Sequence, residues 1–158
     1  MGLRYGFSGS RTITEAQERI IADVLESLLP GCEYTTGGCI GVDSFIGRAM
    51  WLKYPDATHR IVVPFDRSRV EPWWMHRAIR DAGPASGVLL EEMPPGTTYR
   101  DRNQRIVDHA DVLVAFPAHA EDDPKSKRSG TWQTIRMARR AGLEVKVTVL
   151  DTGPRTIA

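Results

Sequence analysis

The sequence predicts an α/β fold, a single Rossmann-like domain in which helices cover both faces of an open, mostly parallel sheet. Three observations lead to this prediction. Short apolar runs alternate along the chain with glycine-bearing loops and amphipathic helices. The run from Asp111 to Phe116 is apolar after its first residue, as in a strand that is covered on both faces. The length of 158 residues suits one domain, which we place at residues 1–150, with a loose tail at residues 151–158.

The individual elements follow from the apolar periodicity and from the residues that interrupt it. A strand is predicted over residues 3–8. Thr14 and Gln17 have the spacing of a capping box, so a helix is expected to begin there and to end before Pro30-Gly31. The same reasoning predicts strands at 33–36, 60–65, 87–91, 111–116 and 144–150, and helices around Phe45–Met50, at 71–81, at 99–109 and from Gly130 to Gly142.

Composition and charge exclude several classes of protein. The 21 Lys and Arg residues against 20 Asp and Glu residues leave a net charge of +1, so a nucleic acid is an unlikely partner. No apolar run approaches the roughly 18–20 residues of a membrane-spanning helix, and the N-terminus lacks the pattern of a secretion signal. The two cysteines do not make a disulfide framework. We therefore expect a cytoplasmic protein with no membrane partner.

Ligands of such a sheet bind beyond the carboxyl ends of the strands, where loops lead into helix N-termini. The unpaired N–H groups and partial positive charge of those termini suit phosphate. At the first junction, Gly9 lets a ligand approach the backbone, Ser10 can donate to a phosphate oxygen and Arg11 can pair with its charge. A tight turn with a solvated arginine explains the same residues equally well.

The second junction holds Gly37, Gly38 and Gly41 within five residues, directly before a helix. Each glycine weakens a regular element by about 0.5–1 kcal/mol, so this density favours a loop that a ligand approaches closely. Asp43 lies in the first turn of the helix, where it complements the helix dipole or accepts hydrogen bonds from a ribose. We interpret Cys39 as a small loop residue rather than as a nucleophile activated at a helix N-terminus.

Two further segments carry candidate phosphate ligands. Ser129, Gly130 and Thr131 open the last helix, where they either cap it or hold a phosphate. Arg100 and Arg102 stand with Asn103 at the start of the helix at 99–109. Cations at a helix N-terminus oppose the helix dipole at a cost of about 0.3–1 kcal/mol each, which a bound anion would offset. The alternative is a solvated helix face on which Asp101 pairs with Arg105.

The remaining candidates are two tryptophans, a charged loop, and the histidines and cysteines that could bind a metal. Trp73 and Trp74 are adjacent on a predicted helix and cannot both face the core, so one is expected to contact a base or a subunit interface. Ordinary helix packing is the alternative. The charged loop at 117–128 is either a lid that orders on phosphate through its cations or a solvated loop. The histidines and cysteines lack metal-ligand spacing, so we expect no metal and no resident cofactor.

Taken in order, these segments resemble the SLOG superfamily, a Rossmann-like group that recognises nucleotide-derived ligands. The resemblance rests on Gly-Ser-Arg at 9–11, Thr-Gly-Gly-x-x-Gly-x-Asp at 36–43, Arg-x-Arg-Asn at 100–103, the strand at 111–116 and Ser-Gly-Thr at 129–131. It covers about residues 6–149, and no single motif in it is specific. Relatives in that group include a DNA-processing protein, "lonely guy" phosphoribohydrolases, and sensor and sequestering proteins for cyclic ADP-ribose-type signals.

The resemblance implies a protein that binds a nucleotide or nucleotide-derived signalling molecule, such as an ADP-ribose derivative, as a sensor or sequestering protein, and that forms a homodimer or a higher homo-oligomer. The alternative is an N-glycosidic nucleotide hydrolase that releases free base. However, Gln133 and Thr134 stand where the phosphoribohydrolases of the group carry two glutamates. An amide cannot stabilise an oxocarbenium-like transition state as a carboxylate does, and only Asp43, Asp66, Glu91 or Glu92 would remain to substitute. Binding to a single-stranded nucleic acid is a third, weaker possibility.

Overall fold

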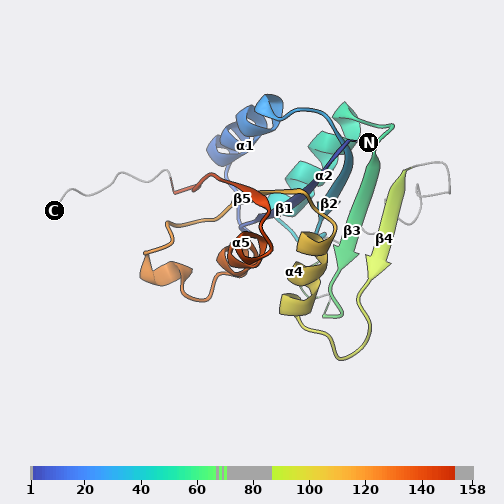
Figure 1. The fold of residues 1–158 in the computed structure, drawn as a ribbon. Helices are drawn as coiled ribbons and strands as arrows, with labels where there is room; N and C mark the ends of the chain where they lie inside the picture. The colour runs from blue at the N-terminus through green and yellow to red at the C-terminus, as the bar shows by residue number, and fades with distance from the viewer. Residues whose placement is uncertain (1, 67, 69, 71–86, 152–158) are drawn as a thin grey trace.

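The structure is a computed structural model that describes residues 2–66, 68, 70 and 87–151. The helix expected at 71–81, with Trp73 and Trp74, and the tail at 152–158 lie outside the described residues. The elements are β1 (Leu3–Gly9), α1 (Glu15–Ser27), β2 (Gly31–Thr36), α2 (Val42–Lys53), β3 (Thr58–Val63), β4 (Val88–Glu92), α4 (Tyr99–Asp108), β5 (Val112–Phe116), the 3₁₀ turn η1 (Pro124–Ser126), α5 (Gly130–Arg140) and β6 (Glu144–Val147) (Figure 1).

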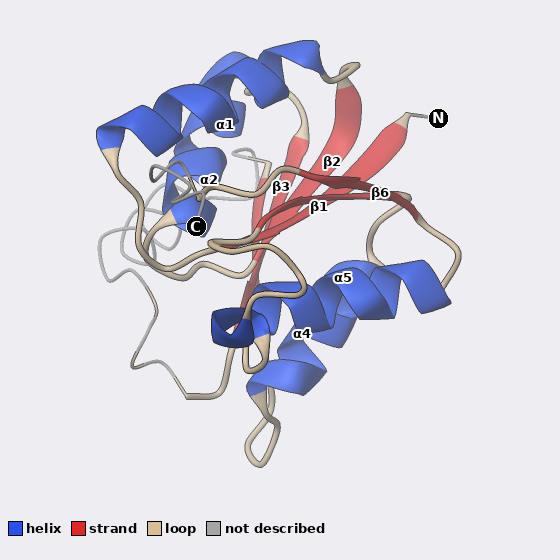
Figure 2. Cartoon of the chain, turned by 90° about the vertical axis from the view of Figure 1, so that its left-hand side faces the viewer, coloured by secondary structure: helices blue, strands red, loops and turns tan. Residues whose placement is uncertain are grey.

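The six strands form one sheet in the order β4-β3-β2-β1-β5-β6, and every pair of neighbouring strands is parallel. Helices cover both faces: α1 and α2 lie on one side of the sheet, and α4 and α5 on the other (Figure 2). The predicted α/β fold is therefore confirmed. The strand order reverses at β1, which pairs with β2 on one side and β5 on the other. In open α/β sheets this switch point is where ligands bind.

Successive residues of β1 face alternately towards the two layers of helices. Tyr5 and Phe7 are buried towards α1 and α2, and both rings stack on Tyr34 of β2, with centroid distances of 5.8 and 6.3 Å. Gly6 faces the other layer. A Cβ atom there would lie 3.0 Å from Ala110 Cβ and 3.1 Å from Ile106 Cγ2, so the absent side chain allows α4 to pack closely on the sheet.

The helix starts follow local hydrogen bonding. The capping box predicted at Thr14 is present, with Gln17 N donating to Thr14 Oγ1 at 3.2 Å and Thr14 N donating to Gln17 Oε1 at 3.0 Å. Thr98 and Asp101 form a second capping box at the start of α4. The ion pair between Asp101 and Arg105, which the alternative interpretation of this helix start required, is not formed, because Asp101 caps the helix and Arg105 pairs with Glu91. Among the described helices, none is long and apolar enough to cross a membrane.

Candidate functional site

A cavity of about 950 Å³ opens at the carboxyl ends of β1 and β5, at the switch point of the sheet. The loop after β1, the start of α2, the first two turns of α4 and one face of α5 along its length contribute to its walls, together with Ser68. Three helices thus begin at or beside the same cavity. Its position is the one that the sequence predicts for a ligand site.

Ten of the twelve residues predicted to bind the ligand line this cavity. They are Gly9, Ser10, Arg11, Asp43, Arg100, Arg102, Asn103, Ser129, Gly130 and Thr131. Gly37 and Gly38 are not among the lining residues. The proposed base contacts, Trp73 and Trp74, lie outside the part of the chain that the structure describes.

The glycine loop is packed against Arg102 rather than opened to the cavity. Arg102 is 6% exposed, and its Nη1 donates to the carbonyl of Gly37. A Cβ atom at Gly37 would lie 2.3 Å from Arg102 Nη1 and 2.8 Å from Asp43 Oδ2. The structure therefore explains Gly37 by its contact with a buried guanidinium and not by the approach of a ligand.

Most donors of Arg102 are used within the protein. Its Nε donates to Asn103 Oδ1 at 3.1 Å and its Nη1 to the Val62 carbonyl at 3.4 Å, and both terminal nitrogens lie within 3.6 Å of Cys39 Sγ. The sequence predicts that Arg102 supplies charge to the ligand. Its contacts make it a brace between α4, β3 and the glycine loop at the wall of the cavity, and a role in binding the ligand stays a prediction.

Asp43 is buried at the base of α2 beside this guanidinium. Its Oδ2 accepts a hydrogen bond from the backbone amide of Cys39 at 3.4 Å. Burial raises the pKa of the Asp43 carboxyl, while the charge of Arg102 acts in the opposite direction. Asp43 is also the only carboxylate among the described lining residues, so the acidic chemistry available in the described wall is restricted to this one group.

Cys39 has the environment of a structural cysteine. The residue is 5% exposed, and burial, together with the nearby Asp43 charge, raises the pKa of its thiol. A raised thiol pKa disfavours the thiolate that a nucleophile requires. Its interpretation as a loop residue fits the structure better than the catalytic alternative.

The loop after β1 forms a tight turn at the cavity wall. Ser10 Oγ accepts from the Thr12 amide at 3.2 Å, and the Ser10 carbonyl accepts from the amide of Val42 at 3.0 Å. Gly41, at a φ of +86°, allows the turn to touch α2, since a Cβ there would lie 2.5 Å from the carbonyl of Arg11. The side chain of Arg11 lines the cavity and is exposed.

At the start of α5, both predicted roles are compatible. Ser129 is the N-cap, with its Oγ accepting from the Trp132 amide at 3.2 Å. The capping bond involves neither the Gly130 nor the Thr131 amide, which are the first two of the helix. Gly130 and Thr131 line the cavity. The cap therefore does not occupy the amides that an anion would use.

Cationic side chains dominate the described wall of the cavity. Seven of them line it, against the single carboxylate of Asp43: Arg11, Arg100, Arg102, Lys127, Arg128, Arg136 and Arg140. Arg136, Arg140 and Gln133 are not among the ligand-binding residues predicted from the sequence. Their spacing of i, i+3 and i+7 places all three on one face of α5, which is the signal that a helical-face analysis would use.

The charged loop before α5 is tied to the domain at several points. Trp132 Nε1 donates to the His119 carbonyl at 2.9 Å, and Ser126 Oγ donates to the Ala120 carbonyl at 2.6 Å. Lys127 and Arg128 at its end line the cavity. Both cations therefore face the cavity in this arrangement of the loop.

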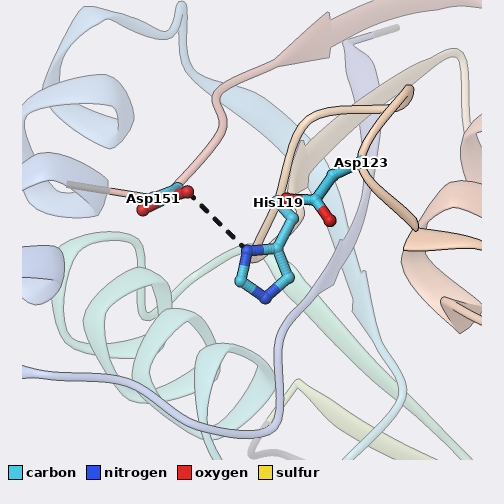
Figure 3. Close-up of side chains that lie close together, drawn as sticks. All are labelled: His119, Asp123 and Asp151. Carbon is cyan, nitrogen blue, oxygen red and sulfur yellow. Dashed lines mark ion pairs between the residues drawn. The ribbon is translucent and has the colours of Figure 1, made fainter. Parts of the chain in front are cut away.

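One cluster of potential metal ligands occurs among the described residues. His119 Nδ1 lies 3.8 Å from Asp151 Oδ2, and Asp123 stands beside them (Figure 3). The three ligand atoms lie within 4.8 Å of one another, and Asp151 comes from a segment far along the chain from His119 and Asp123. Asp123 Oδ1 already accepts from the Lys125 amide at 2.8 Å and caps η1. The expectation that the protein holds no metal stays a prediction.

These features define a Rossmann-like α/β domain with a cationic cavity at its switch point. No protein-family model and no curated protein sequence matches the chain. Among solved structures, the fold is similar to the X-ray structure of DNA processing protein A (DprA) from Streptococcus pneumoniae, with a TM-score of 0.66 and 18% sequence identity. The match covers 92% of this chain but 50% of that one, so the chain spans about half the length of its structural neighbour. The likeness shows a shared fold.

Proposed function

We propose that this protein binds a nucleotide or a nucleotide-derived signalling molecule in the cavity at the carboxyl ends of β1 and β5, as a sensor or sequestering protein of the SLOG type. The observation that carries the proposal is the charge of the described wall, with seven cations against one carboxylate beside the N-terminus of α5. Phosphate is the biological anion that best fits such a combination. The fold shared with DprA and the ordered motifs of the sequence support the same proposal.

In this proposal, different walls of the cavity take different parts of the nucleotide. The Gly130 and Thr131 amides, Arg11, Arg100 and Arg128 are placed for phosphate groups, whereas Phe7, Ile40 and Ile106 form the apolar part of the wall. A cavity of about 950 Å³ lies within the range of sites for small molecules and cofactors. A mononucleotide or dinucleotide therefore fits the size as well as the charge of the site.

The hydrolase alternative finds less support. Glu91 is held by Arg105, by His109 (Nε2–Oε2 3.2 Å) and by Arg60 (Nη1–Oε2 3.6 Å), and it does not line the cavity. Asp43 is buried and bonded to backbone, so a water or a glycosidic oxygen would need to reach a carboxyl already in use. Binding without cleavage is the simpler function of these residues.

The test is a retention assay with purified protein and a mixed nucleotide panel that includes ADP-ribose derivatives. Mass spectrometry identifies compounds that are held through filtration and released on denaturation. We expect one intact compound at up to one equivalent per chain. Appearance of a free base would establish the hydrolase instead, and retention of no nucleotide at stoichiometric concentration would contradict the proposal.

Two neighbouring arginines of α5 provide a matched pair of variants. Arg140 lines the cavity, whereas Arg139 does not and instead pairs with Glu121 at 3.2 Å. Both are exposed and both lose one positive charge on substitution by glutamine. Arg140→Gln is expected to weaken retention about fivefold, the equivalent of about 1 kcal/mol for a solvent-accessible charge contact, and Arg139→Gln to leave it unchanged.

A further inference from the structure

Gln133 lies on the second turn of α5, lines the cavity and is half-buried. Its side-chain oxygen Oε1 accepts a hydrogen bond from Asn103 Nδ2 at 3.3 Å. Asn103 in turn accepts through Oδ1 from Arg102 Nε at 3.1 Å. Three side chains from two helices thus form one chain of hydrogen bonds that ends at the cavity.

The direction of this chain follows from the chemistry of arginine. A guanidinium only donates hydrogen bonds, so the group of Asn103 that faces Arg102 must be its carbonyl oxygen. The Asn103 amide nitrogen must then face Gln133, and the group of Gln133 that meets it must be Oε1. Arg102 and Asn103 are each 6% exposed, so water has little access to reverse the pattern. The orientation of both amides is therefore imposed from the buried guanidinium outwards.

This orientation leaves the Nε2 amide group of Gln133 for the cavity. No hydrogen-bond partner for Nε2 occurs among the described residues. The group lies one turn beyond the α5 N-terminus and precedes Arg136 on the same helix face, between two features that attract anions. A fixed N–H donor in this position can hydrogen-bond to an acceptor atom of a ligand but not to a donor group.

We propose that Gln133 is a specificity-determining residue that donates Nε2–H to a phosphoryl oxygen of the bound ligand, and that Arg102, acting through Asn103, positions it to do so. The inference rests on the proposed function. The inference adds that this wall recognises a ligand group that carries only hydrogen-bond acceptors. The phosphate chain of a nucleoside diphosphate is such a group. The inference also gives Arg102 an influence on the ligand without direct contact.

The experiment measures the affinity of the full chain for ADP and for sodium pyrophosphate by titration calorimetry. Gln133→Glu keeps the acceptor for Asn103 but replaces the donor by a negative charge, and Gln133→Met removes both groups at similar size. Gln104→Glu is the control, because Gln104 is an exposed residue of α4 that does not line the cavity and undergoes the same change of charge. Melting temperatures of all variants establish that each is folded.

We expect Gln133→Glu to weaken both ligands more than tenfold, Gln133→Met about five- to tenfold, and Gln104→Glu less than twofold. The side-chain amide signal missing from the ¹H–¹⁵N spectrum of Gln133→Glu identifies Gln133, and it is expected to shift on titration of the wild type with pyrophosphate. Wild-type binding with unchanged affinity in Gln133→Glu and Gln133→Met would overturn the inference and leave the proposed function intact. Absence of wild-type binding to both anions would overturn the inference alone, because the proposed function is decided separately by the retention assay with the full nucleotide panel.

Discussion

Replacement of Arg102 by methionine tests the buried brace on which the glycine loop and the cavity wall depend. Methionine fills much of the volume of the arginine stem but offers no donor. The carbonyls of Gly37 and Val62 and the side-chain oxygen of Asn103 would lose their partner in the interior, and Asp43 would lose the nearby positive charge. Removal of one member of a buried charged pair costs about 3–5 kcal/mol.

The loss of unfolding free energy in Arg102→Met is expected to depend on pH, because Asp43 titrates beside the lost guanidinium. Burial holds the folded-state pKa of Asp43 above its usual value of 3.8, and the charge of Arg102 limits that rise. In the window between 3.8 and the folded-state pKa, the native state binds more protons than the unfolded state, so the free energy of unfolding decreases as pH rises. Without Arg102 the folded-state pKa of Asp43 is higher, so this pH window extends to higher pH. The destabilisation by Arg102→Met is therefore expected to be larger at pH 8 than at pH 5.

Urea unfolding at the two pH values, followed by circular dichroism, measures these quantities. The expected loss at pH 8 is about 3–5 kcal/mol. Asp43→Asn in the Arg102→Met background should recover part of it, because the amide removes the buried charge that has no counterpart. A loss below about 1 kcal/mol, the range of an exposed ion pair, would refute the idea that Arg102 braces the fold.

Three other substitutions or modifications follow from the packing. Gly9→Ala places a Cβ 2.4 Å from Cγ1 of the buried Val42 and is expected to cost about 1–3 kcal/mol in urea unfolding; an unchanged midpoint would mean that α2 shifts freely. Thr35→Val should raise the free energy of unfolding by about 1 kcal/mol, since the buried Thr35 hydroxyl has no partner among the described groups, and a loss of similar size would reveal one. Iodoacetamide is expected to label the exposed Cys32 in the native protein and Cys39 only after denaturation, whereas equal rates would restore Cys39 as a reactive thiol.

The fold could be predicted from sequence because its signals are local. The capping box at Thr14, the apolar strand before Phe116 and the glycines that end helices each act within a few residues. Boundaries were less accurate where pairing decides them. The last strand ends at Val147 rather than Leu150, although the Leu150 amide still donates to the Pro117 carbonyl at 2.9 Å. Such a bond depends on a segment more than thirty residues away and leaves no local pattern.

The position of the cavity was predictable from the sequence, but the contacts of its lining residues were not. Strand-to-helix junctions converge at one edge of a parallel sheet, so ten of the twelve predicted residues line one cavity. Which of them face a ligand is decided by tertiary contacts. Arg102 has the composition of an anion ligand, yet it is buried and donates to Gly37 from 65 positions along the chain. Gly37 likewise reflects this contact, whereas Gly41 is explained by its close approach to the Arg11 carbonyl.

The net charge of +1 conceals the feature on which the proposed function depends. Outside the cavity, several carboxylates are paired with cations, as in Asp111 with Arg4 at 2.9 Å and Glu33 with Arg60 at 2.9 Å. Arg11, Arg100 and Arg128 all line the cavity, and none of them has an ion-pair partner among the described residues. The positive charge of the cavity wall therefore arises from where the ion-pair partners lie, and not from an excess of basic residues in the chain. Mutual repulsion of the cations opposes folding of the free protein, and the anion of the proposed function would relieve it. If that function holds, binding and stability are coupled through the same side chains.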